Sequence, residues 1–383
     1  MSPAPSQLEV GLVITALGCG GAERMLAMLA NHLAGRGHPV TVFVLNEPGT
    51  FFELDPTVEV RTFAAAPGAE GSRLTRPLRR VRWLRQELGR RRPDVVVSFI
   101  DVANVLALLA TRGTGVPVVV SERTNPLRHR VSWPYRLLRR LAYPRAANVV
   151  VQSKETAAWA ASFVPAGRVR VMANPVRATE TEGEPELALP SRRWLVGVGR
   201  LDPVKRFEVL IDVFAPLAAQ HPMWSLLLLG EGPERGRLEA AVRRHGLESR
   251  VWLPGAVRVT DPVLRQCHLF ALTSRYEGFP NALCEAMACG IPAVSFDCPT
   301  GPREIVRDGV DGLLVPDGDA GALRAALDRL MGDDSLRERL GARATEVVTR
   351  FAAAGILGSW EALCVEVASS GNQPEPRHRG SMA

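Results

Sequence analysis

Residues 8–38, LEVGLVITALGCGGAERMLAMLANHLAGRGH, contain the pattern that decides the fold of this chain. An apolar run at 8–15 leads into the glycine-rich stretch 18–21, and a helical pattern begins at Ala22. Short buried strands that alternate with helices are typical of a parallel sheet covered on both faces. We therefore expect the chain to begin with a strand, a glycine turn and a helix.

The same alternation continues through the first half of the chain. A helix rich in Arg and Leu is expected around 77–91. Further strands are expected at VTVFVL after the first helix, then at 94–99, 116–121 and 147–152. This half, residues 1–176, is interpreted as one Rossmann-like domain.

An acidic stretch with Pro and Gly, at 177–191, interrupts the pattern and is typical of a linker. The alternation then restarts, and a second Rossmann-like domain is predicted at 192–350. Its expected strands are WLVGVGR, WSLLLLG, VWLPG, LFALTS, PAVSF and GLLVP, with helices from about 206, 234 and 281. A helix at 351–369, packing back toward the first domain, and a disordered tail at 370–383 complete this division. Because doubly wound sheets bind ligands beyond the carboxyl ends of their strands, we expect an α/β protein with two domains facing each other across a cleft.

The net charge of the 383-residue chain is +7, and it is unevenly distributed. Residues 1–176 contain 23 Lys and Arg against 12 Asp and Glu, a balance of +11. Only two lysines are present, Lys154 and Lys205, which makes each more informative than one arginine among many.

No apolar run approaches the roughly 18 to 20 residues of a membrane span, and no secretory signal is recognisable, so a cytoplasmic location is expected.

The cysteines do not suggest a metal site or a disulfide framework. They form no CxxC pair and share no spacing with histidines, so we interpret them as small buried hydrophobic residues. The six are Cys19, Cys267, Cys284, Cys289, Cys298 and Cys364.

The most informative segment for function is TSRYEGFPNALCEAMACGIP at 273–292. Glu277 lies in a loop after a strand, Asn281 is expected to cap the next helix, and Glu285 is expected in its first turn. The start of a helix offers free N–H groups to an anion, and a carboxylate such as Glu285 can accept two hydrogen bonds from a ribose diol. The residues alone also allow a simpler interpretation, in which Glu285 only complements the helix dipole and Glu277 is a solvated loop charge.

This segment resembles the donor-binding signature of the retaining GT-B enzymes called glycosyltransferase family 4, S-x-x-E-G-F/L-x-x-x-x-x-E-A-M/L-A-x-G-x-P. Upstream, VGVGRLDPVKRFEVLI resembles the phosphate-binding element of the same family, with Arg200 and Lys205 as its paired cations. The resemblance extends from about residue 10 to 350. It implies that Arg200 and Lys205 bind a diphosphate and act in catalysis with Glu277, which orients the transferred sugar. Asn281, Ala282 and Glu285 would complete the nucleotide-sugar site.

The glycine stretch GCGGAER resembles the N-terminal loop of the family, which implies that Gly20 and Gly21 approach the donor phosphates. By itself this stretch is weak, because it also resembles an incomplete dinucleotide fingerprint with Glu47 as the ribose-binding acid. A dehydrogenase, however, would not explain the segments at 200–285.

The acceptor side is assigned to the loop VVVSERTNP. Many relatives carry a histidine on a loop of the first domain, whereas the matching position here is Arg123. Glu122, Arg123 and Asn125 are the candidates, with a structural salt bridge as the alternative for Arg123. His129 is an alternative to Arg123, although its arginine-rich surroundings favour a surface position.

No metal or other cofactor is expected. Asp317-Gly-Asp319 imitates the DxD metal motif of the other glycosyltransferase fold, but the AGALRAAL that follows favours a helix cap. The diphosphate would instead be neutralised by side chains.

Two arginine-rich segments indicate a partner. Residues 73–92 contain nine Arg and one acid, and residues 123–145 contain seven Arg and no acid, both interleaved with Leu, Trp or Tyr. Basic amphipathic helices of this kind suit an anionic membrane surface. The alternatives are a solvated arginine face and, from charge alone, nucleic acid, for which no recognised module is present.

The sequence therefore predicts a retaining glycosyltransferase that uses a UDP-sugar and acts on a lipid-linked saccharide or related glycan. It is expected to be peripheral on the inner face of the membrane, without binding nucleic acid. The resemblance favours an N-acetylhexosamine or related sugar but leaves its identity, the base, the linkage and the oligomeric state open. The alternatives are a transferase of a soluble acceptor, such as a natural-product aglycone, and a catalytically silent member that only binds a sugar nucleotide.

Overall fold

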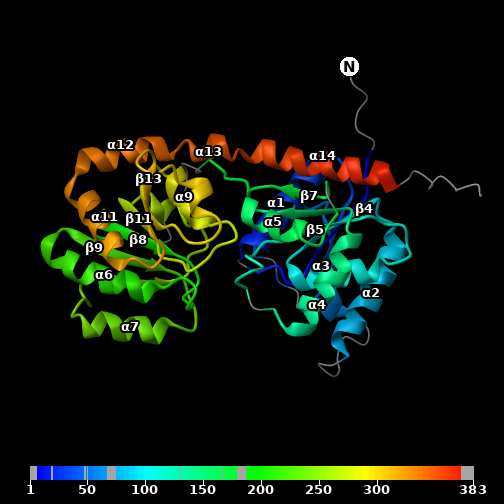
Figure 1. Cartoon of the computed structure of the whole chain (residues 1–383), viewed down its shortest axis with the longest axis horizontal. Helices are drawn as coiled ribbons and strands as arrows, with labels where there is room; N and C mark the ends of the chain where they lie inside the picture. Colours follow the sequence, from blue (N-terminus) through cyan, green and yellow to red (C-terminus); the bar gives the residue numbers. More distant parts are fainter. Residues whose placement is uncertain are drawn as a thin grey trace, which may run out of the picture. The chain divides into compact units, whose positions relative to one another are not determined.

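The chain folds into two compact units, each built around a parallel β-sheet (Figure 1). A computed structural model describes residues 7–18, 20–46, 49, 51–66, 75–129, 131–165, 167–178 and 187–371. The first unit comprises Met1–Ala173 and Ala354–Ala383, and the second comprises Asn174–Ala353. The predicted α/β class with two Rossmann-like sheets is confirmed.

The first unit has a seven-stranded sheet in the order β3-β2-β1-β4-β5-β6-β7. Every ladder is parallel, for example Val10 with Val40 and Val10 with Val95. The residues of β1, β2 and β4 are all buried, as expected for strands covered on both faces. The strands are β1 (Val10–Ile14), β2 (Val40–Val44), β3 (Glu59–Thr62), β4 (Val95–Phe99), β5 (Val118–Ser121), β6 (Asn148–Val151) and β7 (Val169–Val171).

Helices cover both faces of this sheet. They are α1 (Gly21–Gly35), α2 (Arg76–Arg91), α3 (Asp101–Ala110), α4 (Trp133–Ala142), α5 (Lys154–Ala161) and α14 (Ala353–Gly371), with 3₁₀ turns at Phe63–Ala65 and Tyr143–Arg145. In Figure 1, α2, α3 and α4 lie on one side of the sheet, and α14 lies on the side of α1. Glu361 of α14 is 2.9 Å from His32 Nε2 of α1, and Trp360 stacks on Phe99 with ring centroids 6.0 Å apart.

The second unit has a six-stranded parallel sheet in the order β10-β9-β8-β11-β12-β13. Its strands are β8 (Arg193–Val198), β9 (Trp224–Leu229), β10 (Val251–Gly255), β11 (Leu269–Leu272), β12 (Ala293–Phe296) and β13 (Gly312–Val315). Its helices are α6 (Phe207–Gln220), α7 (Arg235–Arg244), α8 (Asp261–Leu264), α9 (Asn281–Ala288), α10 (Pro302–Ile305), α11 (Ala320–Gly332), α12 (Asp334–Ala344) and α13 (Val347–Arg350). The sheet and α6, α7, α11 and α12 enclose one apolar core.

The structure adds two strands that the sequence did not reveal, β3 and β7. Both are short and partly exposed, so neither produces a buried apolar run. The C-terminal helix starts at Ala353 and ends at Gly371, which corrects the predicted bounds 351–369 and shortens the predicted tail. The rest of that tail, and residues 179–186 of the predicted linker, lie outside the described residues.

The cysteines in the described part of the chain behave as small core residues. Four are buried and Cys289 is partly buried, and all five are free. Burial raises the pKa of the Cys267, Cys289, Cys298 and Cys364 thiols to about 12. Cys19 and Glu47 lie outside the described residues. None of the helices in the described part of the chain is long and apolar enough to cross a membrane.

Candidate functional site

The turn after β8 and the loop after β11 lie at the same edge of the second sheet. β8 pairs with β9 on one side and with β11 on the other, so the strand order reverses between β8 and β11. Doubly wound sheets bind ligands outside the carboxyl ends of their strands at such a reversal. The two motifs singled out in the sequence therefore meet where this fold class binds a ligand.

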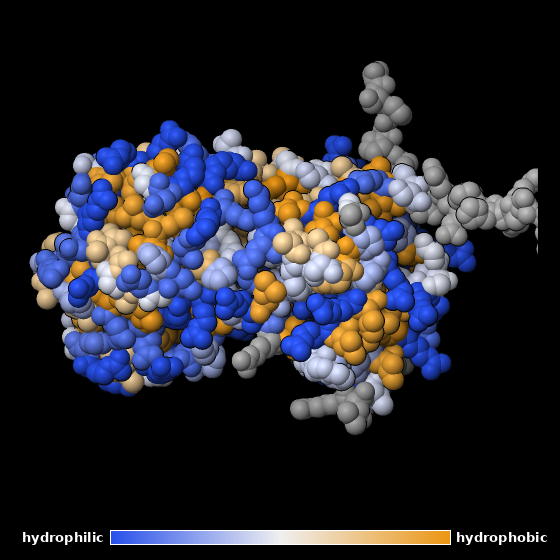
Figure 2. All heavy atoms as spheres, in the orientation of Figure 1, coloured by the Kyte–Doolittle hydropathy of each residue, from blue (hydrophilic) through white to orange (hydrophobic). Residues whose placement is uncertain are grey.

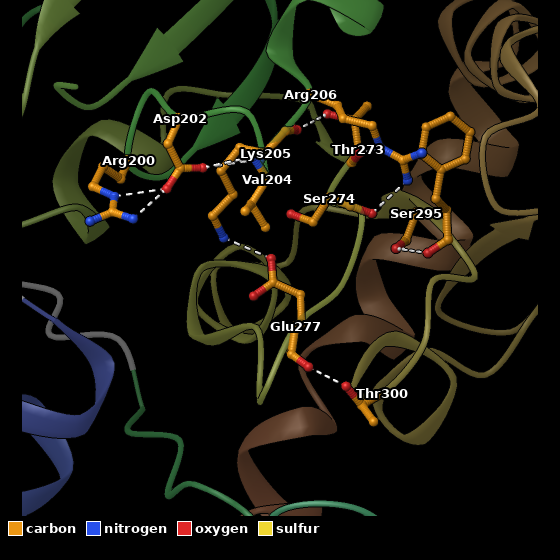
Figure 3. Close-up of polar contacts among 11 residues, drawn as sticks. Arg200, Asp202, Val204, Lys205, Arg206, Thr273, Ser274, Glu277, Ser295 and Thr300 are labelled. Atoms are coloured by element: carbon orange, nitrogen blue, oxygen red, sulfur yellow. Dashed lines mark hydrogen bonds and ion pairs between the residues drawn. The ribbon is translucent and has the colours of Figure 1, made fainter. Parts of the chain in front are cut away.

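Lys205 and Glu277 form the central contact of this edge. Lys205 Nζ donates a hydrogen bond to Glu277 Oε1 at 2.7 Å, as Figure 3 shows. Only 21% of the lysine side chain and 11% of the glutamate side chain are exposed. The structure thus pairs two candidate residues that are 72 positions apart in the sequence.

Arg200 is held by Asp202, a residue that the sequence analysis did not single out. The Arg200 guanidinium donates from Nε to Asp202 Oδ2 at 2.8 Å, and its Nη2 is 2.6 Å from the same oxygen. Asp202 Oδ1 also accepts from the backbone N–H groups of Val204 and Lys205. Asp202 thereby fixes the turn that carries Arg200 and Lys205. Its position between these two residues in RLDPVK is the sequence feature that could have identified it.

Arg206 joins this turn to the loop that carries Glu277. Its guanidinium donates to the carbonyl oxygens of Thr273 and Ser274, both at 2.8 Å, and packs over the Phe296 ring at 4.8 Å (Figure 3). Thr273 Oγ1 donates to the Lys205 carbonyl oxygen at 2.7 Å. These bonds fix the relative positions of the backbone segments that carry Lys205 and Glu277.

Two glycines allow the β8 turn to pack closely. Gly199 has φ +152°, and a Cβ there would lie 2.9 Å from the Lys205 side chain. Gly230 has φ +146°, and a Cβ there would collide with the Gly199 carbonyl oxygen. Substitution of either glycine would therefore displace the lysine-bearing turn.

Helix α9 differs in detail from the sequence-based prediction. The N-cap is Pro280, not Asn281, which is the first helical residue; its Oδ1 accepts from Asn174 Nδ2 at 2.9 Å. Helix α9 has no side-chain capping bond, and Asn281 follows the N-cap position instead of occupying it. Glu285 is the fifth helical residue, one position deeper than a cap at Asn281 would place it, and its Oε2 accepts from Thr260 Oγ1 at 2.8 Å. Asn281, Ala282 and Glu285 are all partly exposed.

The glycine turn of the first unit lies at the carboxyl end of β1. Gly20 is the N-cap of α1, and Gly21 is its first residue. A Cβ at Gly20 would collide with the Glu23 carboxylate, which folds back over the turn. Burial raises the pKa of Glu23.

Glu122, directly after β5, is the buried centre of a polar network. Tyr143 donates its hydroxyl proton to Glu122 Oε2 at 2.7 Å, and Arg139 Nη1 lies 3.6 Å from the same oxygen. Asn104 donates in turn to the Tyr143 hydroxyl at 3.0 Å. Burial raises the pKa of Glu122 to about 7, opposed by the nearby Arg139 cation.

Arg123 lies between two aromatic rings. Neither sequence-based interpretation of this residue, an acceptor contact or a salt bridge, predicted this position. Its guanidinium carbon is 5.3 Å from the centroids of Phe99 and of Trp360 on α14. Burial lowers its pKa to about 9. Asn125 is also buried and accepts from the Leu127 N–H at 3.0 Å. No sequence signal pointed to Trp360.

His129 is half-exposed, and its Nε2 lies 3.8 Å from Asp101 Oδ2. Asp101 is the first residue of α3, and Ile100 before it has φ +73°. A β-branched residue with positive φ is strained, and such strain is concentrated at functional sites. Asp101 was absent from the sequence-based candidates because its position at the edge of the sheet depends on the fold.

The Asp317-Gly-Asp319 segment acts as a helix cap, as predicted. Asp319 Oδ1 accepts from the Ala322 N–H at 2.8 Å and caps α11. Asp317 forms an ion pair with Arg206. Both carboxylates are therefore explained by contacts within the chain.

Two family models match consecutive parts of the chain. The family described as Glycosyltransferase Family 4 matches residues 19–180, and the family described as Glycosyl transferases group 1 matches residues 180–347. Together they extend from the glycine turn to beyond the Asp319 cap. The chain belongs to glycosyltransferase family 4.

The chain is also similar to individual proteins. The glycosyltransferase is 31% identical to an exopolysaccharide phosphotransferase of Streptomyces coelicolor over 93% of this chain, but it spans only 40% of that protein. It is 26% identical, over 94% of this chain and 99% of the relative, to an α-1,4-N-acetyl-D-galactosaminyltransferase of Campylobacter jejuni, named for a saccharide linked to undecaprenol. Its fold matches HepE of Anabaena, solved with UDP and glucose, with a TM-score of 0.79 at 22% identity over 93% of this chain and 99% of that one. The GT-B class inferred from the sequence is thus confirmed.

Proposed function

We propose that this glycosyltransferase moves a sugar, an N-acetylhexosamine or a hexose, from a UDP-sugar to a hydroxyl of a lipid-linked saccharide or related glycan, with retention of the anomeric configuration. The observation that carries this proposal is the convergence of Arg200, Lys205, Glu277 and the start of α9 at the carboxyl edge of one sheet. The name of the Campylobacter relative supports the lipid-linked acceptor, and the UDP bound to HepE supports the nucleotide.

Cations at this edge bind the donor diphosphate. The Lys205 ammonium has three N–H donors, of which Glu277 takes one within the described part of the chain. Arg200 is exposed and offers a planar guanidinium, and the start of α9 adds N–H groups of a helix terminus. Because negative charge accumulates on the departing diphosphate, cations held in place before the reaction lower its barrier. The proposed site needs no divalent metal.

The two glutamates bind different parts of the donor. Glu285, one turn into α9, accepts hydrogen bonds from the ribose hydroxyls, as it accepts one from Thr260 in the structure. Glu277 precedes the helix and orients hydroxyls of the transferred sugar. Its ion pair with Lys205 supports this role, because a sugar-binding group and a phosphate-binding group must lie side by side where the bond between sugar and phosphate breaks.

The transfer itself needs no nucleophile from the enzyme. The bond between the anomeric carbon and the β-phosphate oxygen breaks, and the acceptor oxygen forms a new bond to that carbon on the same face. The acceptor hydroxyl proton passes to the departing diphosphate oxygen. Glu122, Arg123 and Asn125 support the acceptor side as buried residues at the carboxyl edge of the first sheet. The family resemblance assigns the backbone of Gly20 and Gly21, at the start of α1, to the donor phosphates.

Calorimetric titration of UDP into Glu285→Gln and Glu277→Gln tests the division of labour between the glutamates. Glu285→Gln should weaken UDP binding by about 1.5 to 3 kcal/mol, the value of a charge-assisted hydrogen bond. Glu277→Gln should leave UDP affinity nearly unchanged and lower turnover. Glu338→Gln, at an exposed position of α12, is the matched control and should change neither. Equal losses of UDP affinity in the two site variants would contradict the proposal.

A second measurement tests the substrates. The melting temperature should rise with UDP-sugars more than with GDP-, ADP- or dTDP-sugars, because a ligand that binds the native state stabilises it. Radiolabelled sugar should then transfer to a polyprenyl-diphosphate saccharide. Transfer to soluble aglycones alone would overturn the acceptor assignment.

A further inference from the structure

Helix α4 is oriented with its apolar side outward. Of its ten residues, those buried are Arg139 and Ala142. The side chains of Trp133, Leu137 and Leu141 are exposed, with residue exposures of 68%, 46% and 57%. A surface helix of a globular protein normally buries its leucines and exposes its arginines. In α4 the apolar residues are exposed together with two of its arginines, and Arg139 is buried.

The exposed residues form two parallel rows. Trp133, Leu137 and Leu141 are spaced by four residues and lie along one side of the helix. Arg136 and Arg140, also four residues apart and exposed, form the adjacent row. No acidic residue occurs between positions 123 and 145. The outer face of α4 is therefore an apolar stripe bordered by two arginines that form no ion pair with the described part of the chain.

Contacts on the inner side fix this orientation. Arg139 forms an ion pair with the buried Glu122 at 3.6 Å and stacks over the Trp159 ring at 4.7 Å. The 3₁₀ turn that follows α4 contributes Tyr143, which also binds Glu122. Rotating α4 to bury its leucines would break these contacts and expose a charged pair. The outward position of the leucines is thus a consequence of the fold.

Neighbouring segments extend the surface. Leu127, before the helix, and Leu78, on α2, are strongly exposed apolar residues. Burial raises the pKa of Tyr135 on α4, and the Arg80 cation of α2 opposes that rise, so these two residues of α2 and α4 lie near each other. Figure 2 shows hydrophobic spheres, bordered by hydrophilic ones, in the part of the first unit where Figure 1 places these helices.

We propose that the outer face of α4 inserts into the interface of an anionic membrane, with its arginines at the lipid headgroups. Tryptophan with leucine beside a row of arginines is the composition of helices that lie in the membrane plane. Long arginine side chains can keep their guanidinium groups at the headgroups while leucines enter the acyl region. A second copy of this chain fits less well, because two α4 faces in contact would bring their arginine rows together without an acid to neutralise them.

The insertion would also position the proposed chemistry. Arg139 and Tyr143 connect α4 directly to Glu122, at the edge of the sheet assigned to the acceptor. A membrane-bound acceptor would then be delivered beside the helix that holds this carboxylate. Only this last step rests on the proposed function, because vesicle binding requires no sugar substrate.

Sedimentation with vesicles of phosphatidylglycerol and phosphatidylcholine tests the insertion. The wild-type chain should bind anionic vesicles, and pure phosphatidylcholine vesicles much less. Leu137→Glu/Leu141→Glu should lower the vesicle partition coefficient at least about tenfold. Met223→Glu/Val310→Glu, which makes the same change at exposed apolar positions of the second unit, should bind like the wild type. Arg136→Ala/Arg140→Ala should lose about tenfold at low salt and less at high salt.

Fluorescence separates insertion from simple adsorption. Brominated lipids should quench part of the tryptophan emission of the bound wild type, and Trp133→Phe should lose that part while still sedimenting with vesicles. Circular dichroism and the melting temperature check that every variant is folded. The proposal is overturned if folded Leu137→Glu/Leu141→Glu binds vesicles like the wild type, or if quenching is unchanged in Trp133→Phe. It is also overturned if the wild type does not bind vesicles and instead forms a dimer that Leu137→Glu/Leu141→Glu dissociates.

Discussion

The ion pair between Lys205 and Glu277 predicts that the two residues act as one unit. Three variants test this: Lys205→Met, Glu277→Gln and the double substitution. Methionine keeps most of the apolar stem of lysine, and glutamine keeps the shape of glutamate, so each change removes mainly a charge. Both side chains are mostly buried, at 21% and 11% exposure, so removal of one charge leaves the other in poorly hydrated surroundings.

The expected coupling follows from the geometry. At 2.7 Å and an effective dielectric constant of about 20, the attraction is roughly 6 kcal/mol, and desolvation of the two ions offsets several kcal/mol of it. Each single substitution leaves a partly buried ion without its partner and should lower the free energy of unfolding by about 2 to 3 kcal/mol, less than for a fully buried pair. The double substitution removes both charges, so its loss should be smaller than the sum, with a coupling of about 2 kcal/mol.

The effects of the two substitutions on turnover should also be non-additive. Lys205→Met should lower kcat by two to three orders of magnitude, because it removes a cation aimed at the developing phosphate charge. In Lys205→Met the Glu277 carboxylate has lost its partner and repels the diphosphate. Adding Glu277→Gln removes this repulsion, which offsets the loss of sugar orientation, so the rate should change less than about tenfold. Urea unfolding and initial-rate assays of all four proteins give both cycles. If the losses simply add, in stability and in turnover, the two residues do not form a functional pair.

Three further outcomes are expected. Arg206→Lys should lower kcat about tenfold with little change in UDP affinity, because lysine cannot hold the carbonyl groups of both Thr273 and Ser274; a matching loss of UDP affinity would contradict this positioning role. Burial raises the folded-state pKa of Glu122 to about 7, so the folded wild type holds an extra proton and its unfolding free energy should fall between pH about 4.5 and 7, by on the order of 3 kcal/mol at most. Glu122→Gln should abolish this fall; the same pH dependence of the unfolding free energy in both proteins, measured with urea, would refute it. Activity should persist in excess EDTA, and complete loss restored by Mg²⁺ would rule out the metal-free site.

The sequence predicts the sheets well because their signal is local. Runs such as VGLVI at 10–14 and WSLLLL at 224–229 are completely buried strands, and the glycine turns and helix starts follow from the next few residues. The convergence of the segments that carry Lys205 and Glu277 was also predictable, since adjacent parallel strands end at the same side of a sheet. Strands β3 and β7 escaped detection because, at the sheet edges, they bury too little surface to require an apolar run.

Contacts between distant segments were not predictable. Nothing local indicates that Glu277 reaches Lys205, or that Asn174 donates a hydrogen bond to Asn281. The orientation of α4 is a similar case, because its sequence is compatible with leucines facing either way. The buried partner of Arg139 decides the outcome, and that partner is on another element.

The pair formed by Arg139 and Glu122 gives a last prediction, which separates electrostatics from packing. Burial raises the pKa of Glu122, and the Arg139 cation opposes that rise. Arg139→Gln should therefore raise the pKa further, so that the unfolding free energy continues to fall above pH 7, where the carboxylate must ionise without its partner. The variant should lose more stability at pH 8 than at pH 5, where both proteins hold the proton.

Loss of the stack over Trp159 contributes equally at both pH values, so the difference between pH 5 and pH 8 isolates the charge effect. Arg136→Gln, one turn earlier on the exposed face, removes the same charge without touching Glu122 and should show no such difference. Urea unfolding of the three proteins at both pH values provides the comparison. An equal loss at pH 5 and pH 8 for Arg139→Gln would mean that the arginine only packs against Trp159, and that α4 is not electrostatically coupled to Glu122.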